Sequence, residues 1–201
     1  MHPFAKILLA ASLIASAPAL AADKYTIDKS HTNVLFFIDH LGFSQTIGRF
    51  DDVDATLMLD EATPEKSLVD VTIRPASINT QSAELNTHLQ KAEWFNTEKF
   101  PEIRFVSKSV VKTGANTADV TGDLTLLGVT KSVTLKAKLN KADYFQMADA
   151  WIAGFNAETT LKRSDFGMKE GIPFVGDEVR ILISMEFANK EKKRPMPQKK
   201  Q

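Results

Sequence analysis

The chain has 201 residues, with 25 Lys or Arg against 25 Asp or Glu, and contains no cysteine. The even charge balance gives no reason to expect a nucleic-acid partner. The missing cysteine excludes thiol catalysis and thiolate metal sites.

The first residues are typical of a secretory signal peptide. Lys6 precedes an apolar run from Ile7 to Ala17, and small residues at Ala19 and Ala21 form a cleavage-type site. The run is shorter than the roughly 20 residues that a membrane-spanning helix needs. We therefore expect residues 1–22 to be removed and the protein to be exported to the periplasm. What remains suits a single domain.

Short stretches that place apolar side chains at every second position follow this leader, as in strands with one apolar face. The predicted strands are Lys24–Asp28, Thr32–His40, Thr46–Phe50, Asp54–Asp60, Leu68–Arg74, Ile103–Lys112, Ala118–Leu127, Ser132–Asn140, Trp151–Lys162 and Glu178–Ala188. Turn residues such as Leu41-Gly42 separate them. A large antiparallel sheet can cover its apolar face by curling into a barrel, so we predict a mainly β domain over residues 23–188.

One segment between two predicted strands breaks this alternation. Leu85, Leu89 and Ala92 fall at helical spacing. Ser82 suits the N-cap, and Pro101 stops the segment. A helix inserted here can close one end of a barrel.

The end of the chain is basic. Asn189–Gln201 holds six Lys or Arg and one Glu, with two prolines and no apolar periodicity. This composition predicts a disordered tail over residues 189–201. The tail is either a solvated segment or a site of transient contact with an anionic membrane surface.

Several short motifs follow one another through most of the chain. They are Tyr25-x-Ile27-Asp28-x-x-His31, Val34-x-Phe36-x-Ile38-x-His40-x-Gly42-Phe43-Ser44, Gly48-x-Phe50, Ser77-Ile78-x-Thr80, His88-Leu89, Trp94-Phe95, Phe100-Pro101-x-Ile103-x-Phe105-x-Ser107, Gly122-Asp123-Leu124-Thr125-Leu126-Leu127-Gly128-Val129-Thr130-Lys131, Arg163-x-Asp165-Phe166-Gly167 and Gly176-Asp177-x-Val179. In order and spacing they resemble the YceI-like family of exported, lipocalin-like barrels.

The resemblance implies a single antiparallel eight-stranded lipocalin-like barrel with one helical insertion between strands. It also implies periplasmic binding, storage or transport of a long isoprenoid lipid, of the polyprenyl or isoprenoid quinone type. The family has no established catalytic activity, so we expect neither an enzyme nor a cofactor. The expected partner is the lipid itself, and the expected assembly is a monomer or a homodimer.

The candidate lipid-binding residues combine inward-facing strand positions with residues of the loops and of the helical segment. They are Phe36, Ile38, His40, Phe43, Phe50, Leu57, Leu59, Val71, Ile73, Leu85, Leu89, Trp94, Phe95, Phe105, Leu124, Leu126, Leu135, Phe155, Arg163, Phe166, Met168, Phe174, Ile183 and Met185. Taken singly, each of these residues is more simply interpreted as ordinary core, and the argument for a ligand rests on the whole set. The thirteen phenylalanines, together with a helical lid, exceed what closing a narrow barrel requires.

The histidines do not show metal-ligand spacing, because neither H-x-H nor H-E-x-x-H occurs. His31 and His40 have opposite parity along one predicted strand, and His88 lies in the helical segment. We expect histidines bonded to Asp28 or to a backbone carbonyl, and no metal.

Other polar residues give weak catalytic signals. The chain has no Gly-x-Ser-x-Gly elbow, although Ser107 and Ser109 are both candidates to point inward. Arg163 and Asp165 suit an ion pair at a strand end, or Arg163 lies near a polar lipid head group.

Two further hypotheses stay open. The first is a barrel enzyme acting on an amphiphile, with His40 or His88 as the base. The second is a stress-related structural or interaction protein whose core is filled by its own side chains. A continuous apolar tunnel favours the lipid carrier, and a packed interior favours the last hypothesis.

Overall fold

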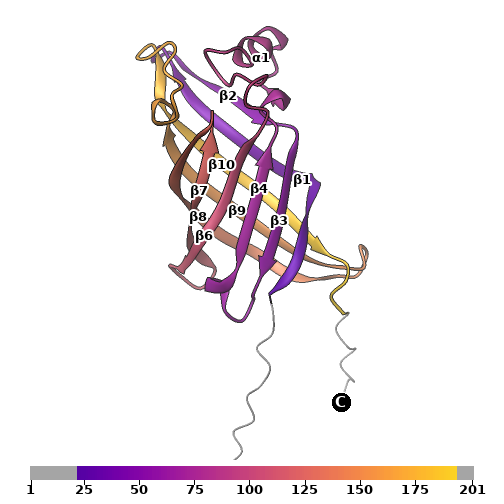
Figure 1. The fold of residues 1–201 in the computed structure, drawn as a ribbon. Helices are drawn as coiled ribbons and strands as arrows, with labels where there is room; N and C mark the ends of the chain where they lie inside the picture. The colour runs from indigo at the N-terminus through magenta and orange to yellow at the C-terminus, as the bar shows by residue number, and fades with distance from the viewer. Residues whose placement is uncertain (1–21, 194–201) are drawn as a thin grey trace, which may run out of the picture.

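The computed structural model describes residues 22–193. Residues 1–21 of the predicted signal peptide and residues 194–201 of the predicted tail therefore lie outside the described residues. Within residues 22–193, no helix is both long enough and apolar enough to cross a membrane. The chain forms a closed antiparallel barrel with one short helix at one end (Figure 1).

The elements follow the order that the sequence predicts, with a few changes in length. They are β1 (Asp23–His40), β2 (Ser44–Phe50), β3 (Val53–Leu59), η1 (Pro64–Lys66), β4 (Leu68–Ile73), η2 (Pro75–Ser77), β5 (Ile78–Asn79), α1 (Ala83–Leu89), β6 (Ile103–Lys112), β7 (Thr117–Leu126), β8 (Val129–Phe145), β9 (Ala150–Lys162), η3 (Arg163–Phe166) and β10 (Val175–Asn189).

Eight strands form the ring, in the order β1-β3-β4-β6-β7-β8-β9-β10, and β10 pairs back with β1. β1 is long enough to serve two neighbours on one edge. Its first residues, 23–26, pair with β3, and residues 34–40 pair with β2. β2 and the short β5 therefore extend the sheet past the ring at the end that α1 occupies (Figure 1). This confirms the predicted eight-stranded antiparallel barrel.

The first two predicted strands are one continuous strand with an irregularity in its middle. The register of β1 against β10 shifts between Asp28 and Asn33. As a result, Tyr25 and Val34 have opposite parity in the sequence but are both buried, at 1% and 4% exposure. Between the two flanking pairs β1 advances by five residues and β10 by two, and an odd number of extra residues turns the following side chains to the other face.

A second irregularity lies in β6, where the register against β7 shifts between Ser107 and Ser109. Ser107 is buried, and its hydroxyl accepts a hydrogen bond from the Val69 amide. Ser109 is exposed, so the expectation of two inward-pointing serines is wrong for Ser109. Gly122, opposite Ser107, has no room for a side chain, since a Cβ there would lie 2.4 Å from the Val106 carbonyl oxygen.

The helical segment is shorter than its apolar spacing predicts. α1 begins after Ser82, whose hydroxyl accepts a hydrogen bond from the Leu85 amide, as expected for an N-cap. It ends at Leu89, and Ala92 lies outside it and is exposed. The rest of the segment continues in turns, and the Phe95 ring packs edge-on against Phe50 of β2 at 5.6 Å. α1 and these turns, residues 82–100, form the lid.

The chain end packs against the barrel further than predicted. β10 runs to Asn189, which is buried. Lys192 forms ion pairs with Asp23 at 2.8 Å and with Glu61 at 2.7 Å. Residues 189–193 are therefore held against the barrel, whereas the sequence assigned them to a disordered tail.

Candidate functional site

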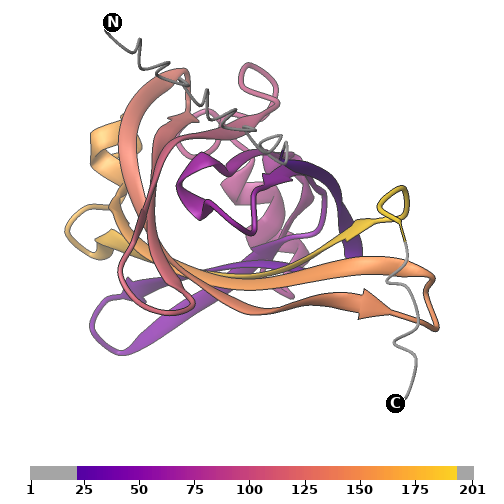
Figure 2. The same ribbon diagram turned by 90° about the horizontal axis from the view of Figure 1, so that it is seen from below.

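The barrel encloses one large cavity of about 940 Å³. Figure 2 shows the ring of strands that surrounds it, seen from the end opposite the lid. All of the candidate residues except Phe43 and Phe174 line this cavity. The volume lies near the upper end of the range of about 300–1,000 Å³ that is usual for small-molecule sites.

Several of the inward-facing apolar side chains are only partly buried, although others, such as Phe36 and Met185, are almost fully covered. Leu135 of β8, Phe155 of β9 and Ile183 of β10 line the cavity and are half-buried. In a close-packed core, large side chains of this kind are almost fully covered by their neighbours. Their uncovered surface faces the cavity instead. The hypothesis that the protein's own side chains fill the core is therefore wrong for this barrel.

The cavity is elongated. It is lined along the whole of β6, from Ile103 near the lid to Lys112 at the far end. At about 3.3 Å per residue, this strand runs for about 30 Å. The cavity therefore has the shape of a tube whose walls are apolar through most of their length.

The two ends of the tube differ in character. At the lid end, Leu85, Leu89 and Trp94 close over it. At the far end, Glu61 and Lys112 join the lining and bring charge to it. The middle of the tube is mainly apolar, so a charged group of a ligand could meet charged side chains only at the two ends.

Arg163 is the buried charge at the lid end. It is 3% exposed, and its guanidinium donates to the carbonyl oxygens of Gly176, Met168 and Val175 at 2.8, 3.1 and 3.0 Å. It also stacks on Trp94, 5.3 Å from the ring centroid. Burial lowers the pKa of Arg163 from its ordinary value. The guanidinium fixes the loop after η3 and places a positive charge at the cavity wall.

The predicted ion pair between Arg163 and Asp165 is not formed among the described residues, because the guanidinium is bonded to backbone carbonyls instead. The neighbouring carboxylate that orders this corner is Asp177. It accepts hydrogen bonds from the amide and hydroxyl of Ser164, at 2.9 and 2.8 Å. These bonds lower the pKa of Asp177.

Two histidines border the cavity near the lid. The Trp94 indole N–H donates to Nε2 of His88 at 2.9 Å, which engages that lone pair. His40 is exposed at the end of β1 and contributes to the lining. Of these two, His88 serves to hold Trp94 in place.

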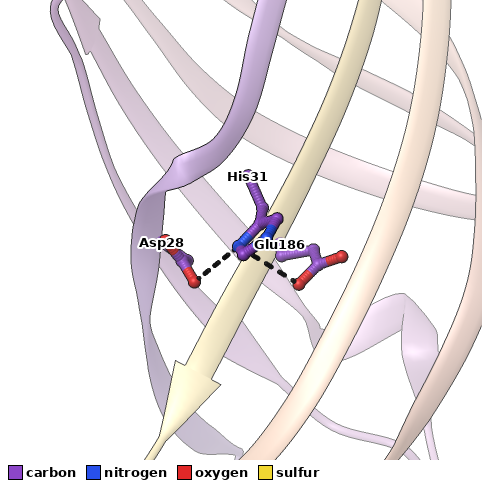
Figure 3. Close-up of side chains that lie close together, drawn as sticks. All are labelled: Asp28, His31 and Glu186. Carbon is purple, nitrogen blue, oxygen red and sulfur yellow. Dashed lines mark hydrogen bonds and ion pairs between the residues drawn. The ribbon is translucent and has the colours of Figure 1, made fainter.

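The third histidine lies on the outside of the barrel, in a cluster with Asp28 and Glu186 (Figure 3). His31 Nδ1 is 3.0 Å from Asp28 Oδ2 and 4.0 Å from Glu186 Oε2. Hydrogen bonds from Ser30 and His31 lower the pKa of Asp28 to about 2. The same contact with Asp28 raises the pKa of His31. The expected bond between a histidine and Asp28 is confirmed within β1, and the longer contact of His31 with Glu186 reaches β10 where the barrel closes.

The sequence predicted that Phe43 and Phe174 line the cavity, and this prediction is wrong for both. Phe43 is 90% exposed and Phe174 is 67% exposed, and both lie outside the lining. Both lie in loops, Phe43 in the β1–β2 turn and Phe174 directly before β10. Alternation along a strand does not extend into a turn, and so it could not place these two side chains.

A further group of residues that line the cavity was not among the candidates chosen from the sequence. Val69, Val120, Leu139, Ile181 and Phe187 share the parity of predicted lining neighbours and do line the cavity. Parity alone was sufficient to find them. Of the charged residues at the far end, Glu61 comes from a loop and Lys112 from the last position of β6, where the apolar alternation has ended.

Comparison with known proteins fits this geometry. A family model described as the YceI-like domain matches residues 25–187. The chain belongs to the YceI-like family. Its relatives include Protein YceI of Escherichia coli O17:K52:H18, 45% identical over 181 residues that cover 88% of this chain and 92% of the relative.

Solved structures give the same result. The chain is similar to Burkholderia cenocepacia BcnA, with a TM-score of 0.72 and 25% identity, over 80% of this chain and 98% of BcnA. It also has the fold of a polyisoprenoid binding domain from Saccharophagus degradans implicated in plant cell wall breakdown. There the TM-score is 0.64 and the identity 14%, over 82% of this chain and 97% of that domain. At that identity the likeness concerns the fold.

Proposed function

We propose that the YceI-like barrel binds a long isoprenoid lipid in its cavity and stores or carries it in the periplasm. The observation that carries the proposal is the elongated cavity of about 940 Å³, part of whose apolar lining is only half-buried. An apolar chain that enters the tube covers this surface. Each methylene removed from water contributes about 0.8 kcal/mol, so a long chain has ample driving force even after ordering costs.

The isoprenoid class is supported by two observations. A protein of the same fold is named as a polyisoprenoid binding domain. In addition, the tube follows the length of β6 and is narrow enough to be enclosed by eight strands, which suits a single extended chain better than a compact ligand. Arg163, at the lid end, is the group best placed to meet a polar head, such as a quinone carbonyl or a phosphate.

Fluorescence offers a direct test, because the chain has two tryptophans and Trp94 lines the cavity whereas Trp151 does not. In a Trp151→Phe variant, Trp94 is the remaining emitter. Titration of lipid-free protein with an isoprenoid quinone should quench this emission to saturation at one lipid per chain. A water-soluble quinone without the isoprenoid tail is the control, and should quench without saturating. Equal behaviour of the two quinones would contradict the proposal.

Export to the periplasm rests on the leader composition of residues 1–22. Fractionation of cells that express the full chain should release a shortened protein with the periplasmic contents. Full-length protein retained in the cytoplasm would contradict this part of the proposal. Transient membrane contact by the basic residues after Asn189 is a separate proposal, and it is sensitive to salt because it depends on charge.

We propose that the protein acts by binding without catalysis. His88, one of the two candidate bases, already accepts a hydrogen bond from Trp94 at the nitrogen that faces it. His40 is the remaining candidate. A His40→Ala variant that binds the quinone normally but loses turnover of an amphiphilic ester would favour an enzyme instead.

A further inference from the structure

The exposed apolar side chains of the protein are unevenly distributed. Five of the nine large hydrophobic residues that remain exposed in the described chain lie in the β1–β2 hairpin and in the loop before β10, at one end of the barrel. They are Leu41, Phe43, Ile47, Ile172 and Phe174, with exposures of 47%, 90%, 53%, 37% and 67%. We call these five residues the apolar rim. Single exposed hydrophobic residues are normal, but a contiguous group marks a binding surface.

The two loops that carry the rim are in contact. The Leu41 amide donates to the Phe174 carbonyl oxygen at 2.8 Å. In Figure 1 the tip of the β1–β2 hairpin and the loop before β10 lie together at the upper left, beside α1. The rim is therefore one surface built from segments far apart in the sequence.

The rim lies at the cavity. His40 and Val175 pair with each other, and both line the cavity. Leu41 directly follows the first of them, and Phe174 directly precedes the second. The apolar wall of the tube thus continues, within one residue on each loop, into apolar side chains that face the outside.

The β1–β2 hairpin has a leucine, Leu41, at a position whose backbone conformation favours glycine or asparagine. Leu41 and Gly42 have φ of 59° and 71°, a left-handed backbone that glycine and asparagine adopt most easily. A leucine there strains the turn and is almost half exposed.

We propose that the apolar rim is a membrane-docking surface, through which an apolar ligand passes between a lipid bilayer and the cavity. Neither rim loop carries charge at residues 41–48 or 171–176, so both can enter the interfacial layer without burying an ion. A protein partner is a poorer fit, because stable protein interfaces use about 20–30 residues a side. The ligand passage rests on the proposed function, whereas the docking itself does not.

The test uses flotation of the exported protein, residues 23–201, with vesicles of phosphatidylethanolamine and phosphatidylglycerol. The wild type should float with the vesicles at both low and high salt. Phe43→Ser together with Phe174→Ser should weaken partitioning, by about tenfold for each phenylalanine. Leu41→Asn should also weaken it while leaving the protein as stable or more stable.

The matched control is Phe145→Ser with Met147→Ser, in the β8–β9 loop region, where the wild-type side chains are 48% and 89% exposed. These changes should leave flotation unchanged. Equal loss of binding in the control, or unchanged binding in the rim variant, would overturn the proposal. Binding that high salt abolishes would also overturn it, since it would assign docking to charge, as in the basic tail.

Two further measurements distinguish membrane docking from the proposed function and from contact between two copies of the chain. The rim variant should take up the isoprenoid quinone from detergent as the wild type does, because its residues lie outside the cavity lining. If neither the wild type nor the rim variant takes up the quinone, but the wild type still floats with the vesicles, the proposed function fails and the docking stands. If the rim variant converts a dimer into a monomer without changing flotation, the rim is a contact between two copies of the chain, and the proposal fails.

Discussion

Replacing Ala157 with phenylalanine would show directly whether the tube is empty space that a ligand needs. Ala157 of β9 lines the cavity and lies opposite Ala137 of β8, which also lines it. A ring at this point would occupy space in the tube without displacing a large side chain. The expected effect on the free energy of unfolding is therefore small.

The effect on lipid binding should be large. If the ring forces the bound chain to withdraw by about five carbons, one isoprene unit, the loss is at most about 4 kcal/mol at about 0.8 kcal/mol per methylene. That corresponds to roughly a thousandfold weaker affinity. The quenching of Trp94 by an isoprenoid quinone measures the affinity, and thermal unfolding measures the stability. Shorter isoprenoid chains should lose less than long ones.

The matched control is Asn156→Phe, which adds the same ring at the neighbouring exposed position outside the cavity lining. It should leave quinone affinity unchanged. The reasoning would be refuted if Ala157→Phe bound the quinone normally and were destabilised by about 1–3 kcal/mol, the cost of overpacking a filled core. Such destabilisation would lower Tm by several degrees in a domain of this size.

Three further predictions concern the framework around the cavity. Arg163→Met should lower the free energy of unfolding in urea by about 2 kcal/mol, because three carbonyl oxygens in a buried or partly buried setting lose their donor; unchanged stability would contradict this. Gly122→Ala should cost about 1–3 kcal/mol, whereas Gly154→Ala, where the nearest atom to a new Cβ is 3.8 Å away, should be close to neutral in the same assay; similar losses would refute the close approach. The contact between Asp28 and His31 should raise the pKa of His31 in an NMR titration, and Asp28→Asn should lower that pKa, although the carboxylate of Glu186 still favours the charged imidazole. Because the pKa of Asp28 falls from 3.8 to about 2 on folding, its stabilisation is present above pH 3.8 and lost as the pH falls toward 2, so wild type and Asp28→Asn should converge in stability there.

The fold was accessible from the sequence because a barrel repeats one simple rule. Side chains alternate between two faces, and apolar residues at one parity identified the inner wall on β4, β7, β8 and β10. The rule failed where the strands are irregular. Ser109 points out of the barrel because the register of β6 against β7 shifts between Ser107 and Ser109. The residues around this shift carry no pattern that predicts it.

The site was only partly accessible for the same reason. Inward strand positions such as Leu135 and Phe155 were found by parity, and both line the cavity. Loop residues were not, because a turn obeys no alternation. Phe43 and Phe174 were assigned to the cavity on their chemistry, while their outward orientation depends on how two distant loops meet. Whether the tube is empty also depends on the packing of the whole barrel, which no single segment encodes.

The central claim is that the barrel encloses an apolar tube that a long lipid occupies. The most direct measurement is mass spectrometry of an organic extract from protein purified, without detergent, out of the compartment to which it is exported. The account predicts one isoprenoid lipid per chain in the wild type, and a shorter or absent lipid in Ala157→Phe. An extract of the wild type free of lipid, from protein that also fails to bind an added isoprenoid quinone, would contradict it.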